Sequence, residues 1–271
     1  KSSRKGIHLR SPYDGSLTIL TPKKLIELQE ALGSDVAMVI DDMAPPDASR
    51  EEFMKALEKT HRWAKECKEL HQDTDQLLFA IVQGGYDAAL RKESAEYLSS
   101  LDFDGYGIGG CAIGEPKPDM YRAIKNSTPF LPDEKPRYLM GVGSPPDVVQ
   151  AVSLGVDCFD SIFPTRNARH NMIFTRNGSY QMEKARFANH DGPLEEGCAC
   201  FTCTHHSTAY VRHLSTIDEA EGFRLRQVHN VHFMMRLMED IRESILKGEF
   251  SSFKDRFMQG WFKGKVPKLY Q

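Results

Sequence analysis

Three of the six cysteines stand within six residues of one another, as Cys198, Cys200 and Cys203. Such closely spaced thiolates are typical of metal ligands, whereas a disulfide framework spreads its cysteines along a short secreted chain. A tetrahedral zinc site needs a fourth ligand. The candidates are the histidines in and after the cluster, namely His205, His206, His213, His229 and His232.

His205 and His206 lie too close to Cys203 in the sequence to wrap comfortably around the same ion. His229 opens a stretch in which apolar residues recur at helical spacing, and a ligand at the start of a helix often closes a cysteine-rich site. A closed shell of four ligands leaves no open position for catalysis. We therefore predict one structural Zn²⁺ held by Cys198, Cys200, Cys203 and His229. The alternative is a set of free core cysteines beside a solvated histidine.

A second group of candidate residues lies where five short apolar runs end, and it comprises Asp41, Gln83, Gly109–Gly110, Met140 and Asp160. A carboxylate accepts hydrogen bonds from ring N–H and amino groups, and an amide both donates and accepts. Glycine lets the backbone approach a flat ligand, and methionine offers an adaptable apolar surface. Together these residue types predict a site for a planar heterocycle such as guanine. For either acid alone, the alternative is a helix cap or a salt bridge.

A basic segment follows Asp160, with Arg166 and Arg169 three residues apart and Arg176 further on. Arginines in this arrangement can hold the phosphates or base edges of a nucleic acid. The alternative is an ordinary salt-bridged loop. A second basic cluster, near Lys254 and Lys265, is more typical of a solvated amphipathic helix.

These candidates need a scaffold that brings distant segments together, and the apolar runs predict one. The runs are Val36–Asp41, Leu78–Gln83, Tyr106–Gly110, Tyr138–Gly141 and Cys158–Phe163. They are nearly continuous, as expected for parallel strands that are buried on both faces. Helix starts lie between or before them, at Thr21–Pro22, at the Ser49–Glu52 capping box and at Ser144–Pro145. We expect these helices to end near Gly33, Glu69 and Gly155.

Repeated βα units of this kind predict an α/β fold that closes into a (β/α)₈ TIM barrel. After Phe163 the pattern changes to a hairpin around Arg176–Gly178, for which Asn-Gly favours a type I′ turn, and then to a helix from about Gln227 to Lys247. We therefore expect a single catalytic domain over residues 1–271, with a zinc-binding subdomain at about residues 184–235.

Composition excludes several classes of protein. Of the 271 residues, 40% are hydrophobic and 27% charged, which is close to the average for globular proteins and unlike disordered or collagenous chains. The formal net charge of −3 excludes a globally basic nucleic-acid coat. No apolar run reaches the roughly 18 residues of a membrane span, and no signal peptide is evident. We expect a cytoplasmic protein that has no membrane partner.

Taken together, the motifs resemble those of the tRNA-guanine transglycosylases, or queuine tRNA-ribosyltransferases, over nearly the whole chain. The resemblance rests on Gly109–Glu115, Leu139–Gly143, Phe159–Arg169 and the Cys198, Cys200, Cys203 and His229 set. The spacing to His229 is similar to that of the bacterial and eukaryotic forms rather than the archaeal one. The family fold is a (β/α)₈ barrel with a zinc subdomain.

The resemblance implies a pentosyltransferase of queuosine biosynthesis. Such an enzyme exchanges guanine at the wobble position of tRNAs with G-U-N anticodons for a 7-deazaguanine, through a covalent enzyme–ribose intermediate. It implies that Asp160 is the nucleophile and that Arg166 and Arg169 bind the anticodon loop of the tRNA. It assigns base binding to Asp41, Gln83, Gly110, Cys111, Ala112, Tyr138 and Met140. Family members are usually homodimers.

The sequence departs from the family pattern in three places. The family's Asp-Ser-Gly-Gly motif, whose aspartate acts as general acid or base, is not found, so we expect an N-terminal portion of the barrel to lie outside this sequence; the alternative is a natural fragment that needs a partner. Ile113 favours the small 7-aminomethyl-7-deazaguanine over queuine, although Met43 leaves queuine possible. Asn171 replaces a usual glycine.

There are three alternative functions. The first is a non-catalytic, zinc-bearing, tRNA-binding partner subunit, against which the intact Asp160 argues. The second is a related enzyme that inserts deazapurines into DNA. A metal-dependent barrel hydrolase would need histidines at the strand ends, and none of the five runs ends in one.

Overall fold

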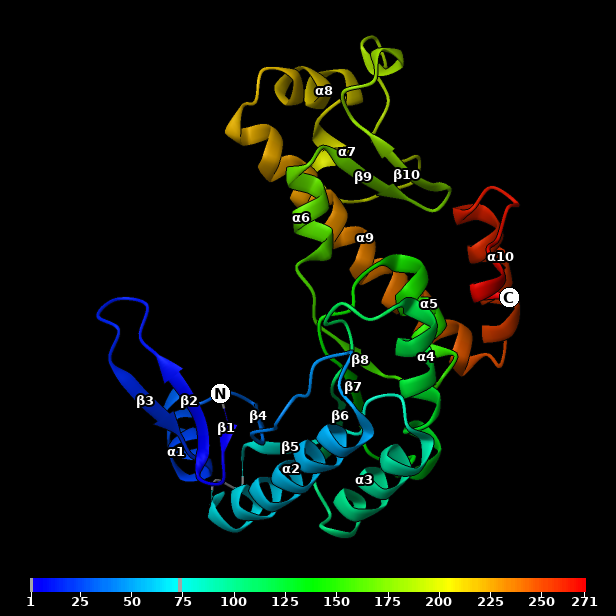
Figure 1. Cartoon of the computed structure of the whole chain (residues 1–271). Coiled ribbons are helices and arrows are strands. Elements are labelled where there is room, and N and C mark those ends of the chain that lie inside the picture. The colour runs from blue at the N-terminus through cyan, green and yellow to red at the C-terminus, as the bar shows by residue number, and fades with distance from the viewer. Residues whose placement is uncertain (1, 73–74) are drawn as a thin grey trace. The chain divides into compact units, whose positions relative to one another are not determined.

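The computed structural model describes residues 2–72 and 75–271 (Figure 1). The chain divides into two compact units. The first contains residues 1–141 and 154–160, and the second contains residues 142–153 and 161–271. The single domain expected over residues 1–271, with its subdomain at about 184–235, remains a prediction.

A curled, all-parallel sheet forms the centre of the first unit. Its strands are β4 (Val36–Met38), β5 (Leu77–Val82), β6 (Gly105–Ile108), β7 (Arg137–Leu139) and β8 (Cys158–Phe159). They pair in chain order, β4-β5-β6-β7-β8, so consecutive βα units are neighbours in space. All five predicted strands are present, and the curled parallel sheet with its helices confirms the predicted α/β barrel architecture. The first and last strands end earlier than expected, β4 at Met38 rather than Asp41 and β8 at Phe159 rather than Phe163, where a helix already begins.

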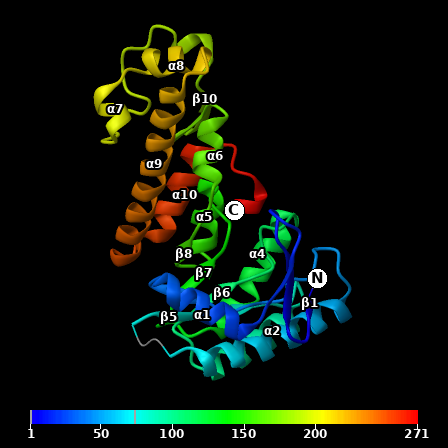
Figure 2. The same ribbon diagram turned by 90° about the vertical axis from the view of Figure 1, so that its left-hand side faces the viewer.

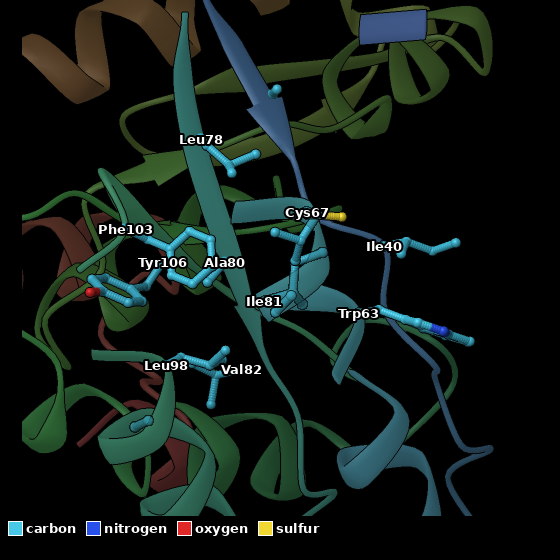
Figure 3. Close-up of a cluster of buried hydrophobic side chains, with 14 of the residues drawn as sticks. Ile40, Trp63, Cys67, Leu78, Ala80, Ile81, Val82, Leu98, Phe103 and Tyr106 are labelled. Carbon is cyan, nitrogen blue, oxygen red and sulfur yellow. The ribbon is translucent and has the colours of Figure 1, made fainter. Parts of the chain in front are cut away.

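The apolar runs form strands because both faces of this sheet are covered. Five of the six residues of β5, from Leu78 to Val82, are buried. Figure 3 shows Leu78, Ala80, Ile81 and Val82 of this strand among side chains from the flanking helices. Trp63 and Leu98 from those helices are fully buried in the same cluster. A strand that contacts apolar groups on both faces needs no alternating pattern.

The helices of the first unit are α1 (Pro22–Leu32), α2 (Arg50–Leu70), α3 (Ala88–Ser100), α4 (Lys117–Lys125) and the short 3₁₀ helix η1 (Thr128–Phe130). Two of them, α1 and α2, begin and end close to the predicted signals, and the others had no predicted bounds. Thr21 caps α1, and Gly33 ends it in the left-handed conformation. At α2, Ser49 and Glu52 form the expected capping box. Figure 1 shows α2 and α3 on the same side of the sheet.

A small antiparallel sheet precedes these units and was not predicted. It contains β1 (Ser2–Ser3), β2 (Gly6–Arg10) and β3 (Leu17–Leu20), in the order β1-β2-β3. Its partly buried Ile7 and Leu20 pack against the core of the first unit. The sequence signal was weak because these strands carry a mixture of polar and apolar residues.

The second unit is mostly helical. Its elements are α5 (Pro145–Val152), α6 (Phe163–Arg169), β9 (Met172–Thr175), β10 (Gly178–Gln181), η2 (Ala185–Phe187), α7 (Phe201–His205), α8 (Thr208–Thr216), α9 (Ala220–Leu246), α10 (Phe250–Trp261) and η3 (Lys268–Tyr270). Figure 2 shows α7 and α8 at the N-terminal end of the long helix α9. A core of Ile173, Met182, Leu194, Val211, Leu214 and Leu225 joins the hairpin, α8 and α9.

Three details of the second unit differ from the sequence predictions. Helix α5 ends at Val152 rather than near Gly155, and α9 begins at Ala220 rather than near Gln227. The hairpin is present, but its turn is not type I′. The loop residues between the Thr175–Gly178 pair have negative φ, and the positive φ, +98°, falls on Gly178. The glycine therefore sits one position later than a type I′ turn requires.

None of the helices in the described part of the chain is both long and apolar enough to cross a membrane.

Candidate functional site

Asp41 and Gln83 meet at the carboxyl ends of adjacent strands. Asp41 follows β4 and Gln83 follows β5, and Gln83 Nε2 donates a hydrogen bond of 2.6 Å to Asp41 Oδ2. Gln83 is 3% exposed. Burial raises the pKa of Asp41 above its usual value, while the hydrogen bond from Gln83 acts in the opposite direction. The pair thus places a carboxylate and an amide side by side in surroundings that are largely shielded from water.

The Gln83 amide is packed against the end of the next strand, β6. A β-carbon on Gly110 would lie 2.8 Å from Gln83 Oε1, and one on Gly109 would lie 2.6 Å from Gln83 Nε2. Gly110 also has φ of +65°, a conformation that residues with side chains rarely adopt. The two glycines are therefore required for this close approach of the Gln83 side chain, and their role against a flat ligand stays a prediction.

The loop after β6 contains the next candidates, Cys111 and Ala112. Cys111 is buried, and burial raises the pKa of its thiol to about 11, so the group is neutral at physiological pH. Ala112 is exposed and has φ of +59°. The Glu115 carboxylate accepts hydrogen bonds from the backbone N–H of Ala112 at 2.5 Å and of Ile113 at 2.9 Å. These bonds hold the loop in its strained turn.

Asp160 lies just beyond β8, where two donors reach the same carboxylate oxygen. The Tyr138 hydroxyl donates to Asp160 Oδ1 at 2.7 Å, and the Gly141 N–H donates to it at 2.8 Å. Burial, and then the neighbouring Asp160 carboxylate, raise the pKa of Tyr138, so its hydroxyl keeps its proton and donates. The other oxygen, Oδ2, has no hydrogen bond within the described part of the chain, and the residue is exposed.

Neighbouring contacts link these residues into one continuous site. Gln83 bonds Asp41 and packs on Gly110, and a β-carbon on Gly141 would lie 3.7 Å from Cβ of Ala112. Gly141 in turn bonds Asp160. The carboxyl ends of all five strands are therefore joined in order, with Met140, half-buried, after β7. This edge of a parallel sheet is where α/β barrels carry their chemistry.

The predicted metal ligands come together in the second unit. One ligand atom from each of Cys198, Cys200, Cys203 and His229 lies within 4.8 Å of the others. The three sulfurs are 3.7, 3.6 and 3.3 Å from His229 Nδ1. A tetrahedral zinc ion with ordinary Zn–S and Zn–N bonds separates sulfur and nitrogen by about 3.6 Å. The donor set and its spacing therefore fit a metal ion.

The surroundings of His229 orient its ring for ligation. Its Nε2 lies 2.8 Å from the Phe174 carbonyl oxygen, which can only accept, so Nε2 carries the proton. Nδ1 is then free to face the three sulfurs. A ligating histidine whose other nitrogen donates to a carbonyl is typical of metal sites. Cys200 also caps α7, where its sulfur accepts from the Cys203 N–H at 3.4 Å.

Arg166 and Arg169 lie on α6, a short helix of the second unit, rather than on the loop that was one alternative. Both side chains are exposed. Buried side chains of α9 donate hydrogen bonds to the backbone carbonyls of this helix. Arg226 Nε donates to the Ala168 carbonyl at 2.9 Å, and Asn230 Nδ2 donates to the Pro164 carbonyl at 3.1 Å.

The sequence analysis did not assign roles to Glu115, Arg91 and Ser94, which the structure brings to the strand ends. Glu115 was part of a quoted motif, but its bonds to backbone N–H groups depend on the turn. The buried position of Arg91 could have been predicted from the sequence. At helical spacing it shares a face with Ser94 and Leu98, so a charged residue falls on the buried side of α3.

The model of the family described as queuine tRNA-ribosyltransferase matches residues 1–263. This chain belongs to that family.

Individual relatives of this chain carry the same family name. A queuine tRNA-ribosyltransferase from Dehalococcoides mccartyi (strain ATCC BAA-2100) is 46% identical over 253 residues, covering 93% of this chain and 64% of the relative. Those from Desulforamulus reducens and Symbiobacterium thermophilum are each 44% identical. The match with the Desulforamulus protein covers 95% of this chain and 70% of the relative. The match with the Symbiobacterium protein covers 99% of this chain and 67% of the relative. The chain thus spans about two thirds of these queuine tRNA-ribosyltransferases, and the resemblance inferred from its motifs is confirmed.

Proposed function

We propose that this chain carries out base exchange on tRNA. It replaces guanine at the wobble position of G-U-N anticodons with a 7-deazaguanine, as a pentosyltransferase of queuosine biosynthesis. The observation that carries the proposal is the continuous site at the five strand ends, with Asp41 and Gln83 at one end and Asp160 at the other. The family match over residues 1–263 supports it.

Asp160 has the geometry of an oriented nucleophile. Both hydrogen bonds go to Oδ1, from Tyr138 and Gly141, which fixes the carboxylate plane and leaves Oδ2 for attack. A nucleophile held by preformed donors needs little reorganisation when it reacts. In the proposed reaction Asp160 Oδ2 attacks C1′ of the ribose.

The two displacements balance in electrons and protons. As the Asp160–C1′ bond forms, the C1′–N9 bond breaks and its electron pair leaves with guanine, which takes up a proton from water. The incoming 7-deazaguanine gives its N9 proton to water as it attacks C1′, and the ester oxygen leaves as the Asp160 carboxylate. Two inversions give net retention, as in a retaining glycosidase.

The base pocket of this proposal consists of Asp41, Gln83, Gly110, Cys111, Ala112, Tyr138 and Met140. The Asp41 carboxylate accepts from the N1–H and amino group of guanine, and Gln83 is placed against Asp41 to share the same edge. Met140 gives the ring an apolar surface. Partly buried Ile113 favours 7-aminomethyl-7-deazaguanine, because a branched side chain leaves little room for the larger queuine substituent.

Arg166 and Arg169 are the proposed contacts to the anticodon loop. Both are exposed on α6, and Arg226 and Asn230 fix the backbone of that helix from α9. Guanidinium groups bind phosphate and base edges through paired donors. The target guanosine must leave its stack to reach Asp160, at a cost of a few kcal/mol that base binding offsets.

The metal of the Cys₃His cluster is proposed to be one structural zinc ion per chain. The S–N separations of 3.3 to 3.7 Å support this assignment, as does the closed set of four ligands. Bound zinc would join the loop containing Cys198 and Cys200 to α9 through His229. It anchors the proposed subdomain at about residues 184–235 and takes no part in the displacements.

The deciding experiment is exchange of labelled guanine into unmodified tRNA with a G-U-N anticodon, using the full-length protein and Asp160→Asn. We expect exchange by the wild type and none by the variant, with both proteins binding the tRNA. If neither protein exchanges guanine while tRNA still binds, the catalytic proposal is wrong and the partner-subunit function replaces it.

The proposed assembly is a homodimer, on the basis of the family resemblance. A dimer lets one subunit catalyse while the other supports the tRNA. Sedimentation equilibrium with and without tRNA tests this directly. A monomer under both conditions would contradict it.

A further inference from the structure

Helix α3 presents two polar side chains to the sheet, Arg91 and Ser94, and both are fully buried at 0% exposure. They are three residues apart and so lie on one face of the helix. A buried charge is costly unless its donors are satisfied. The guanidinium of Arg91 therefore needs specific acceptors, and their identity indicates its role.

The acceptors are three main-chain carbonyls at the ends of two strands. Arg91 Nε donates to Gly85 at 2.7 Å, Nη1 to Val82 at 3.1 Å, and Nη2 to Gly109 at 2.8 Å. Val82 is the last residue of β5, and Gly109 directly follows β6. One planar group thus joins the carboxyl ends of two neighbouring strands.

The residues between these carbonyls are those that would contact the base. Gln83 lies between Val82 and Gly85, and Gly110 follows Gly109. The Gln83 N–H donates to Ser94 Oγ at 3.2 Å, so α3 also holds the Gln83 backbone. A β-carbon on Gly110 would lie 3.4 Å from Arg91 Nη2, so the guanidinium lies close to the backbone that follows β6.

Close approach of the backbone to α3 completes the contact. Gly84 has φ of +128°, and a β-carbon there would lie 2.9 Å from the Arg91 backbone nitrogen. The segment after β5 can therefore lie directly on the first turn of α3 only because residue 84 is glycine.

We propose that Arg91 is a positioning residue of the base pocket, whose guanidinium holds the ends of β5 and β6 at the separation needed for Gln83 and Gly110 to meet one planar base. This inference rests on the proposed function, because it concerns the same pocket. Arg91 does not touch the base. It acts through the two strand ends.

Lysine cannot replace arginine in this role. The guanidinium is rigid and planar, and it directs its donors to three carbonyls at once, whereas an ammonium group is a point charge on a flexible stem. Arg91→Lys keeps the charge but loses the fixed spacing, so base binding weakens more than RNA binding.

The matched control is Arg137→Lys in the same unit. Arg137 Nη2 donates to the Leu131 carbonyl at 2.8 Å and to Asp133 at 2.6 Å, and its side chain is 13% exposed. Arg137 begins β7, so it lies at the amino end of the sheet, where a barrel gains stability rather than activity. Ser94→Ala is a second variant in case Arg91→Lys folds poorly. It removes the hydrogen bond from the Gln83 N–H to α3 without changing any charge.

The experiment measures the dissociation constants of guanine and of an anticodon stem-loop RNA for the full-length protein and each variant, below the lowest unfolding midpoint. We expect Arg91→Lys to weaken guanine binding at least tenfold and RNA binding less than twofold. Ser94→Ala should weaken guanine binding by a smaller factor. Arg137→Lys should lower the unfolding midpoint and leave guanine affinity within twofold of the wild type.

Hydrogen exchange of residues 82–86 and 108–112 provides a readout that is independent of ligand. We expect faster exchange of these segments in Arg91→Lys and not in Arg137→Lys. If the wild type binds no guanine, the proposed function is wrong, and the exchange data alone decide whether Arg91 holds the strand ends. A folded Arg91→Lys with wild-type guanine affinity or unchanged exchange overturns the positioning role. An equal loss of guanine and RNA affinity also overturns it.

Discussion

At the residue scale, the proposed chemistry depends on two carboxylates in contrasting surroundings. Asp160 is exposed and has two donors on one oxygen, whereas Asp41 is largely shielded and has one amide donor. The first arrangement orients the carboxylate of the proposed nucleophile. The second makes the ionisation of Asp41 sensitive to what binds beside it, because burial raises its pKa.

The Tyr138 hydroxyl should matter for chemistry more than for stability. Tyr138→Phe removes one of the two hydrogen bonds to Asp160 Oδ1. A bond to a charged group contributes about 1.5 to 3 kcal/mol, so kcat for guanine exchange should fall roughly 10- to 100-fold. Tyr13→Phe is the control, because Tyr13 is 98% exposed, and its exchange rate should equal that of the wild type. Equal rates for both variants would show that Tyr138 does not orient Asp160.

Base affinity should depend on pH through Asp41. In the proposed site the ionised carboxylate is the form that accepts the guanine N–H groups, so KM for guanine should rise as the pH falls through the raised pKa of Asp41. The contribution of Asp41 to stability has the opposite sign. It is fully present below the ordinary pKa of 3.8 and is lost as the pH rises through the raised value.

A pH series of KM with wild type and Asp41→Asn measures this effect. The variant should bind guanine weakly at every pH, with a flat profile over the range in which the wild type changes. An unchanged slope in Asp41→Asn would assign the pH dependence to another group.

At the element scale, helix α9 organises much of the second unit. Three neighbouring positions, Arg226, His229 and Asn230, are buried and polar, and each has a different acceptor or partner. Arg226 and Asn230 hold α6, while Asn230 Oδ1 also accepts from the Phe174 N–H at 3.0 Å. His229 joins the cysteine cluster. The helix therefore connects the metal site, the hairpin and α6.

Loss of the metal should destabilise these elements together. We expect one zinc ion per chain in the wild type and none in His229→Ala, with an unfolding midpoint lower by roughly 10 °C or more, since structural zinc contributes several kcal/mol to folding. Cys158→Ser, outside the cluster and exposed, should keep both metal and midpoint. Metal analysis and thermal unfolding measure both quantities. A His229→Ala protein with full metal content would disprove the ligand assignment.

At the scale of the whole molecule, the chain forms two units that alternate along the sequence. Residues 142–153, with α5, belong to the second unit although they stand between β7 and β8 of the first. The residues of the proposed base site, from Asp41 to Asp160, all belong to the first unit, and the cysteine cluster belongs to the second. Each unit has its own hydrophobic cluster.

Hydrogen exchange should change in only one of the two units when the zinc is removed or when guanine binds. Chelation of zinc should accelerate hydrogen exchange in β9, α7 and the first half of α9, with little change in β5 and β6. Guanine should instead protect the segments after β5 and β6, because a ligand stabilises the unit that binds it. Hydrogen exchange with mass spectrometry measures both. Acceleration spread evenly over both units after chelation would contradict this prediction.

Local sequence signals were sufficient for much of this protein. The apolar runs predicted all five parallel strands, and Thr21, Gly33 and Ser49 marked helix ends because capping depends on a few adjacent residues. The spacing of Cys198, Cys200 and Cys203 predicted a metal cluster for the same reason. His229 was predicted as the fourth ligand at the start of a helix. The structure brings it to the three sulfurs from within α9, which begins earlier, at Ala220.

The tertiary structure decided which oxygens and amides meet. The bond from Gln83 to Asp41 spans 42 positions and that from Tyr138 to Asp160 spans 22, so no local pattern specifies either of them. The antiparallel strands β1–β3 and the role of Arg91 were missed, because both depend on partners that are distant in sequence. Sequence alone determined residue types, strand order and family. Packing of α3 against two strand ends determined which carbonyls Arg91 meets, since a buried guanidinium is stable only where the fold supplies its acceptors.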